Sequence, residues 1–193
     1  MRRDAFLDDR WIPTPHDPDA IRADVARWRD DLVASEAHAA RSGEGSDQAD
    51  VGRALKRLSE GLALLHRWEQ ARAFAARALG IWRDLGRERA AFLATAHLAK
   101  VEAYAGDLDR AAARFERLLE AAADPEHHGA IYRDIVRVDY ACVLAHNGDP
   151  ASARALLLAA VAGQTERGQR AQIAQTTALL ERLGVLEAPG VKG

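Results

Sequence analysis

Three segments of the chain repeat one pattern of large and small residues. The segments are residues 55–79, 95–119 and 137–161. In each of them a large residue is followed at once by a small one, and an alanine comes thirteen residues after the large residue. The large residues are Leu58, Leu98 and Tyr140, and the alanines are Ala71, Ala111 and Ala153. Because two antiparallel helices approach closely only where small residues face each other, the pattern predicts one helical hairpin present in three copies.

The rest of the sequence is also typical of helices. Alanine, leucine and arginine, which are strong helix formers, dominate it. Asp-Pro pairs, which favour helix starts, and glycines, which favour helix ends, divide the chain into segments. They predict helices at about residues 18–41, 47–65, 68–85, 87–105, 107–124, 125–146, 150–163 and 167–183. No run of residues alternates with the period of a strand, so we expect no strands.

The repeated segments resemble the tetratricopeptide repeat (TPR) family. Its signature is W-x2-L-G-x2-Y…A-x3-F…P, and the second segment matches best, with Leu98-Ala99 and then Ala111-x3-Phe115. The segments depart from the signature at the tryptophan and tyrosine positions, which hold Leu55, Thr95 and Arg137, and Leu62, Glu102 and Leu144. Successive alanines lie 40 and 42 residues apart, so the units are longer than the standard repeat. They look like the TPR-like arrays of bacterial regulators, such as maltose-regulon activators and peptide-sensing regulators; an unrelated alanine-rich helical bundle is the alternative.

The resemblance implies an all-α fold. It would be a short right-handed superhelix of three TPR-like helix hairpins, with an N-terminal helix and a C-terminal capping helix. We expect an extended arm at residues 1–17, a helix and loop at 18–46, the repeat domain at 47–184 and a flexible tail at 185–193. The N-terminal helix carries Ile21, Val25, Trp28 and Leu32 at helical intervals, which predicts a seam that packs on the first hairpin.

The resemblance also implies a binding surface, because TPR arrays bind peptides or helices on the face that the first helix of each unit lines. By alignment, the expected groove residues are Arg53, Lys56, Glu60, Leu93, His97, Lys100, Ile135, Asp139 and Cys142. The expected function is a protein-protein interaction module, or adaptor, that holds a peptide or helical segment of unknown identity. The alternative is a small-ligand or peptide sensing domain of a bacterial regulatory system. In a further reading, some of these residues only pack against the N-terminal helix.

Other functions find little support in the sequence. The chain carries 27 Lys and Arg against 29 Asp and Glu, far from the basic stripe of a nucleic-acid-binding protein. It has no apolar run long enough for a membrane span and no apolar signal-peptide core, so we expect a cytoplasmic protein. Its single cysteine argues against disulfides and a thiolate zinc site. His127 and His128 diverge on a helix, and no catalytic motif occurs, so we expect no metal, no cofactor and no enzyme.

The N-terminal arm, FLDDRWIPTPHDP, combines large apolar residues with three prolines. Proline resists helix and favours extended geometry. Phe6, Trp11 and Ile12 would be costly to leave in water in a free tail. We therefore expect the arm to dock across its own repeats or into a neighbouring copy, which would make a homo-oligomer.

Overall fold

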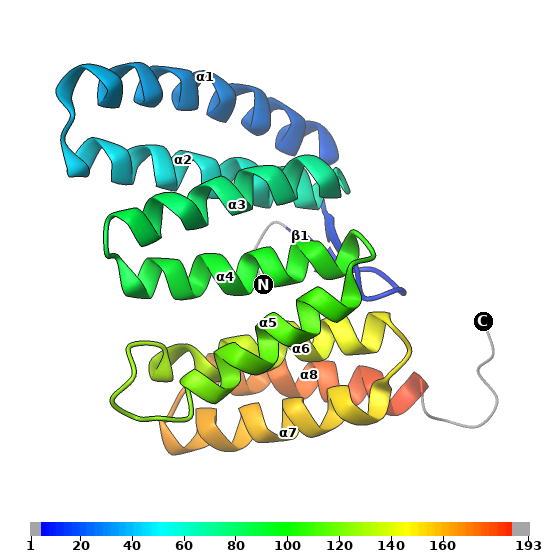
Figure 1. The fold of residues 1–193 in the computed structure, drawn as a ribbon. Coiled ribbons are helices and arrows are strands. Elements are labelled where there is room, and N and C mark those ends of the chain that lie inside the picture. Colours follow the sequence, from blue (N-terminus) through cyan, green and yellow to red (C-terminus); the bar gives the residue numbers. More distant parts are fainter. Residues whose placement is uncertain (1–4, 187–193) are drawn as a thin grey trace. The chain divides into compact units, whose positions relative to one another are not determined.

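A computed structural model describes residues 5–186 of the chain, with side chains for residues 7–184 (Figure 1). Within that range the protein is helical, and neighbouring helices pack together, as predicted. The helices are α1 (Pro18–Ser42), α2 (Gly45–Leu64), α3 (Trp68–Asp84), α4 (Glu88–Tyr104), α5 (Leu108–Ala121), α6 (Arg133–His146), α7 (Pro150–Glu166) and α8 (Arg170–Leu186), with a 3-10 turn at Ala130–Tyr132. No helix in the described range is both long and apolar enough to cross a membrane.

The chain divides into two compact units, Met1–Arg114 and Phe115–Gly193, with the boundary inside α5. In the first unit, helices α1 to α4 follow one another as antiparallel neighbours (Figure 1). The predicted seam of α1 is confirmed, since Ile21, Val25 and Leu32 are buried in one core with residues of α2. Gly61 of α2 lies so close to this seam that an added Cβ would come within 2.7 Å of Val25. In the second unit, α7 packs against both α6 and α8.

Five of the turns between helices share one conformation. Each has a residue with positive φ, and the next residue donates a main-chain hydrogen bond to the carbonyl five positions back, as Asp107 does to Glu102 at 2.9 Å. This pattern is the Schellman motif, which favours glycine at the positive φ position. The residues there are His66, Gly86, Gly106, Gly148 and Gly168. The predicted helix ends at the first three of these glycines are confirmed, and His66 is the exception in the set.

The three alanines of the repeat occupy equivalent positions. Ala71, Ala111 and Ala153 are all completely buried. Each donates its N–H to the carbonyl of the residue four positions back, in the first turn of the second helix of its hairpin. The sequence pattern thus correctly identified three matching buried positions on α3, α5 and α7.

The expectation that the chain has no strands is wrong in the N-terminal arm. Strands β1 (Ala5–Leu7) and β2 (Pro13–Pro15) pair antiparallel, with Leu7 opposite Pro13. The Asp8 carboxylate organises the connecting loop by accepting hydrogen bonds from the N–H groups of Arg10 and Ile12, at 3.0 and 2.9 Å. Side-chain bonds of this kind set a tight turn without any alternating apolar pattern, so the strands could not be predicted from periodicity.

The expected helix start at Pro125 is also wrong, because α6 begins only at Arg133. The Asp124 carboxylate accepts the N–H of Glu126 at 2.9 Å, and His127 Nδ1 accepts the N–H of Gly129 at 3.0 Å. These local bonds favour turns over a helix. At the other end of the second unit, α8 continues past the expected end at Gly184 to Leu186.

Candidate functional site

The predicted groove residues of the first unit lie on α2 and α4. Ser59 on α2 connects the two helices, since its Oγ lies 2.7 Å from both the Ala71 carbonyl oxygen and His97 Nε2 on α4. A carbonyl oxygen only accepts, so the Ser59 hydroxyl proton goes to Ala71 and His97 donates its Nε2 proton to Ser59. This arrangement fixes the His97 tautomer and links α2 to α4.

Both helices that the Ser59–His97 hydrogen bond links also carry charged side chains. Lys56 Nζ pairs with Glu60 at 2.5 Å, one turn apart on α2, and Arg53 pairs with Asp50. Lys100 lies one turn beyond His97 on α4 and is half-buried, as are His97 and Leu93. We call Arg53, Lys56, Glu60, Leu93, His97 and Lys100 the α2/α4 face. Its cationic residues, counted with Asp50, exceed its carboxylates by one.

The other predicted groove residues belong to α6, in the second unit. Ile135 is exposed, with 51% of its surface accessible, and Asp139 is half-buried. Cys142 is buried. Its thiol is therefore poorly placed to touch a ligand, in keeping with the usual role of a lone cysteine as a small apolar core residue.

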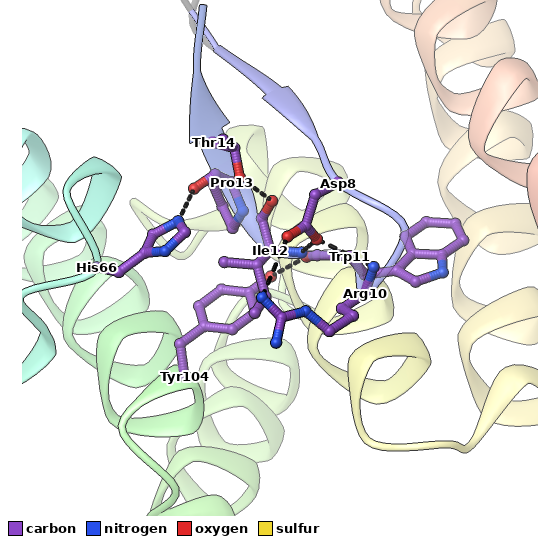
Figure 2. A network of polar contacts seen from close by, with 8 residues as sticks. All are labelled: Asp8, Arg10, Trp11, Ile12, Pro13, Thr14, His66 and Tyr104. Atoms are coloured by element: carbon purple, nitrogen blue, oxygen red, sulfur yellow. Dashed lines mark hydrogen bonds and ion pairs between the residues drawn. The ribbon is translucent and has the colours of Figure 1, made fainter. Parts of the chain in front are cut away.

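The N-terminal arm is held against the first unit (Figure 2). The Tyr104 hydroxyl donates a hydrogen bond of 2.9 Å to the Trp11 carbonyl oxygen. His66 Nε2 lies 3.3 Å from the Pro13 carbonyl oxygen and must supply the proton of that bond. Trp11 and Ile12 are buried, whereas the side chain of Phe6 lies outside the described residues.

A stack of three aromatic rings supports these two hydrogen bonds. His66 stacks on Trp68 with ring centroids 5.4 Å apart, and Trp68 stacks on Tyr104 at 5.3 Å. Because the first and last rings of the stack both bind the arm, its main chain is fixed at two points. The backbone of His66 has a φ of +57°, which is unfavourable for a residue with a side chain. The contact with Pro13 offers a physical reason for histidine at a position where the matching turns have glycine.

A pocket of about 450 Å3 opens between α1 and α2. Small side chains, Ala34 and Ser35 on α1 and Ala54 on α2, leave the space between the two helices. The charged and titratable residues that line it are Asp31, His38, Asp47, Asp50, Arg53 and Arg57. We call it the α1/α2 pocket. The pocket was not predicted from the sequence, because it arises from the separation of two helices; of its lining residues, only Arg53 is among the expected groove residues.

The second unit contains a buried carboxylate between arginines. Asp134 is 3% exposed, accepts a hydrogen bond of 2.9 Å from Arg137 and pairs with Arg167. Burial lowers the pKa of Arg137, and burial together with Arg137 and Arg167 lowers the pKa of Arg133. Gly163 of α7 leaves room for this carboxylate, since an added Cβ would lie 2.7 Å from its Oδ2. The group joins α6 to the end of α7, which is a structural role.

No model of a known protein family matches the sequence, and no curated protein does either. Residues 5–186 contain no group of three or more His, Cys, Asp or Glu side chains placed to hold a metal ion. The α2/α4 face and the α1/α2 pocket are therefore the two candidate binding sites.

Proposed function

We propose that the chain is a non-catalytic interaction module that binds a peptide or a helical segment along the α2/α4 face. The observation that carries the proposal is the hydrogen bond between Ser59 and His97. It links α2 to α4, the first helices of two of the repeated segments, and so supports a binding surface that includes side chains of both helices. A bound segment would contact apolar and charged groups together, which is the usual composition of a peptide-binding surface.

The charge of the face indicates what kind of segment binds. Counted with Asp50, the partner of Arg53, the face holds one more cationic residue than carboxylates, and both Lys56 and Lys100 are partly accessible. An acidic segment would be attracted to this surface, and its carboxylates would compete with Glu60 for Lys56. We therefore expect the bound segments to carry more Asp and Glu than Lys and Arg.

A random peptide library displayed on phage tests this proposal. Wild-type protein should select acidic sequences, and K56E/K100E should lose them. The matched control is R27E/R83E, which makes the same charge change at exposed positions of α1 and α3. Peptides that bind all three proteins equally would place the binding surface elsewhere, and failure to select any peptide would contradict the proposal itself.

The second candidate function is the sensing of a small ligand for a regulatory system. The α1/α2 pocket favours it, because about 450 Å3 falls within the range of roughly 300–1,000 Å3 that is typical of small-molecule sites. A ligand that binds only the folded state raises the melting temperature, and the rise grows with the ligand concentration. A metabolite panel monitored by thermal unfolding tests this function independently of any peptide.

A further inference from the structure

Some of the charged side chains that line the α1/α2 pocket are paired with a neighbour, and others are not. Asp50 pairs with Arg53, so this couple is neutralised within α2. Asp47 accepts a hydrogen bond from Ser42 and lies 3.4 Å from His38 Nε2. Its carboxylate therefore has polar neighbours, while its negative charge is balanced only when His38 is protonated.

Two lining residues remain without such neighbours. The side chains of Asp31 on α1 and Arg57 on α2 form no hydrogen bond and no ion pair with any residue in the described part of the chain. They lie on opposite walls of the pocket, and they do not pair with each other. The pocket thus presents one cationic group on the α2 wall, and carboxylates on both walls, at Asp31 and Asp47.

We propose that the α1/α2 pocket binds a basic amino acid, with the ligand carboxylate at Arg57 and its two cationic groups at Asp31 and Asp47. A guanidinium binds a carboxylate through two parallel hydrogen bonds, which suits Arg57 to the carboxylate end of the ligand. The methylene chain lies against Ala34 and Ala54. With Asp50 and Arg53 neutralising each other, the remaining pocket charge is −1, and a basic amino acid carries +1.

This inference rests on the second candidate function, ligand sensing, and is independent of peptide binding at the α2/α4 face. The proposed arrangement of charges also predicts which compounds related to lysine bind more weakly. Cadaverine has both amino groups of lysine and no carboxylate, whereas norleucine keeps the amino acid end and lacks the second amine. Each analogue leaves one group of the pocket without its partner.

Calorimetric titration of the full chain with L-lysine, L-arginine, cadaverine and L-norleucine is the direct test. We expect lysine or arginine to bind and each analogue to bind about ten- to hundredfold more weakly, since each lacks one charged hydrogen-bonding group. Arg57→Gln should remove the difference between lysine and cadaverine. Asp31→Asn should weaken the binding of lysine. Asp30→Asn and Arg29→Gln, neighbours on α1 outside the pocket lining, are matched controls and should change neither the affinity for lysine nor its difference from cadaverine.

The outcomes separate this inference from the function on which it rests. Equal binding of lysine and norleucine overturns it, and so does lysine binding that neither Arg57→Gln nor Asp31→Asn weakens. A metabolite of a different class could instead raise the melting temperature in the thermal panel. If Asp31→Asn abolishes that rise, the proposed basic ligand is wrong, while ligand sensing at this pocket is supported. A panel without any stabilising compound overturns both.

Discussion

Tyr104 and Trp11 are joined by a hydrogen bond of 2.9 Å between residues that are ninety-three positions apart in the sequence. The donor is at the end of α4, and the acceptor is the carbonyl of a residue in the loop of the arm. Both residues are buried, so if the Tyr104 hydroxyl is removed, water cannot take its place as the donor to the Trp11 carbonyl.

We therefore expect Tyr104→Phe to lower the free energy of unfolding by about 1 kcal/mol and to loosen the arm. Urea denaturation measures the first effect. The second is measured by the rate of tryptic cleavage after Arg10, an exposed residue next to Trp11. The control is Tyr140→Phe, because the Tyr140 ring stacks on Phe115 and its hydroxyl has no hydrogen-bond partner within residues 5–186. Equal cleavage rates for the two variants would contradict this role of Tyr104.

Substitutions at His66 separate the strain in its turn from its contact with the arm. His66→Gly removes both the backbone strain of the positive φ and the hydrogen bond to Pro13. His66→Ala removes the hydrogen bond but keeps the strain. We expect the glycine variant to be more stable than the alanine variant by about 1 kcal/mol. Both should show faster cleavage after Arg10. A glycine variant whose arm is as resistant as that of the wild type would exclude the histidine contact as the reason for this residue.

The three repeat alanines should respond alike to enlargement. Ala71→Leu, Ala111→Leu and Ala153→Leu each add a branched side chain at a completely buried position, and each should cost about 1–3 kcal/mol. Ala73→Leu and Ala151→Leu, at exposed positions of α3 and α7, serve as controls and should have little effect. Thermal and urea unfolding of the five variants provide the comparison. A tolerated substitution at one of the three positions would show that the hairpins are not equivalent there.

Removing one member of the buried pair of Glu102 and Arg114 should lower the free energy of unfolding, whereas replacing both members should lower it much less. Glu102 is 2% exposed and accepts two hydrogen bonds from Arg114, at 2.7 and 3.2 Å. Glu102→Leu alone should destabilise by about 3 kcal/mol because it leaves a largely buried guanidinium without its partner. The double variant E102L/R114L should recover most of that loss, since Leu62 and Leu144 occupy the position of Glu102 in the other hairpins. A double variant as unstable as the single one would contradict this account.

The N-cap of α7 should make stability depend on pH. Hydrogen bonds from Ser152 lower the pKa of Asp149, so the folded state favours its charged form. This stabilisation is present above the ordinary aspartate pKa and is lost as the pH falls through the lowered value. Asp149→Ala should melt at a lower temperature than the wild type at pH 7, and the gap should narrow in acid. For the control Asp30→Asn, the difference in melting temperature from the wild type should not narrow in acid. If the difference for Asp149→Ala stays constant with pH, the prediction is wrong.

The features that were predictable from the sequence each depend on the chemistry of a single residue. Gly86, Gly106 and Gly148 mark turns because glycine has no Cβ to oppose positive φ, and the buried alanines mark the places where helices meet. In the alignment of the turns, His66 already stands where Gly106 and Gly148 stand, and that mismatch could have pointed to the arm contact.

The remaining features depend on residues that are distant in sequence or on space between helices. Glu102 gave no sign of its burial, because its partner Arg114 lies on the next helix. Asp134 is accommodated by the absence of a side chain at Gly163, which the sequence pattern marked as a helix end, whereas α7 continues to Glu166. The α1/α2 pocket depends on how far apart two helices lie, and no residue pattern records that separation.

The bond between Trp11 and Tyr104 also has a consequence for biosynthesis. A ribosome releases the chain from its N-terminus, so the arm emerges while its binding partners are still untranslated. Trp11 must stay in solvent, or with a chaperone, until α4 has left the exit tunnel. The arm, which is made before the helices of the first unit, is thus among the last parts of that unit to reach its final position.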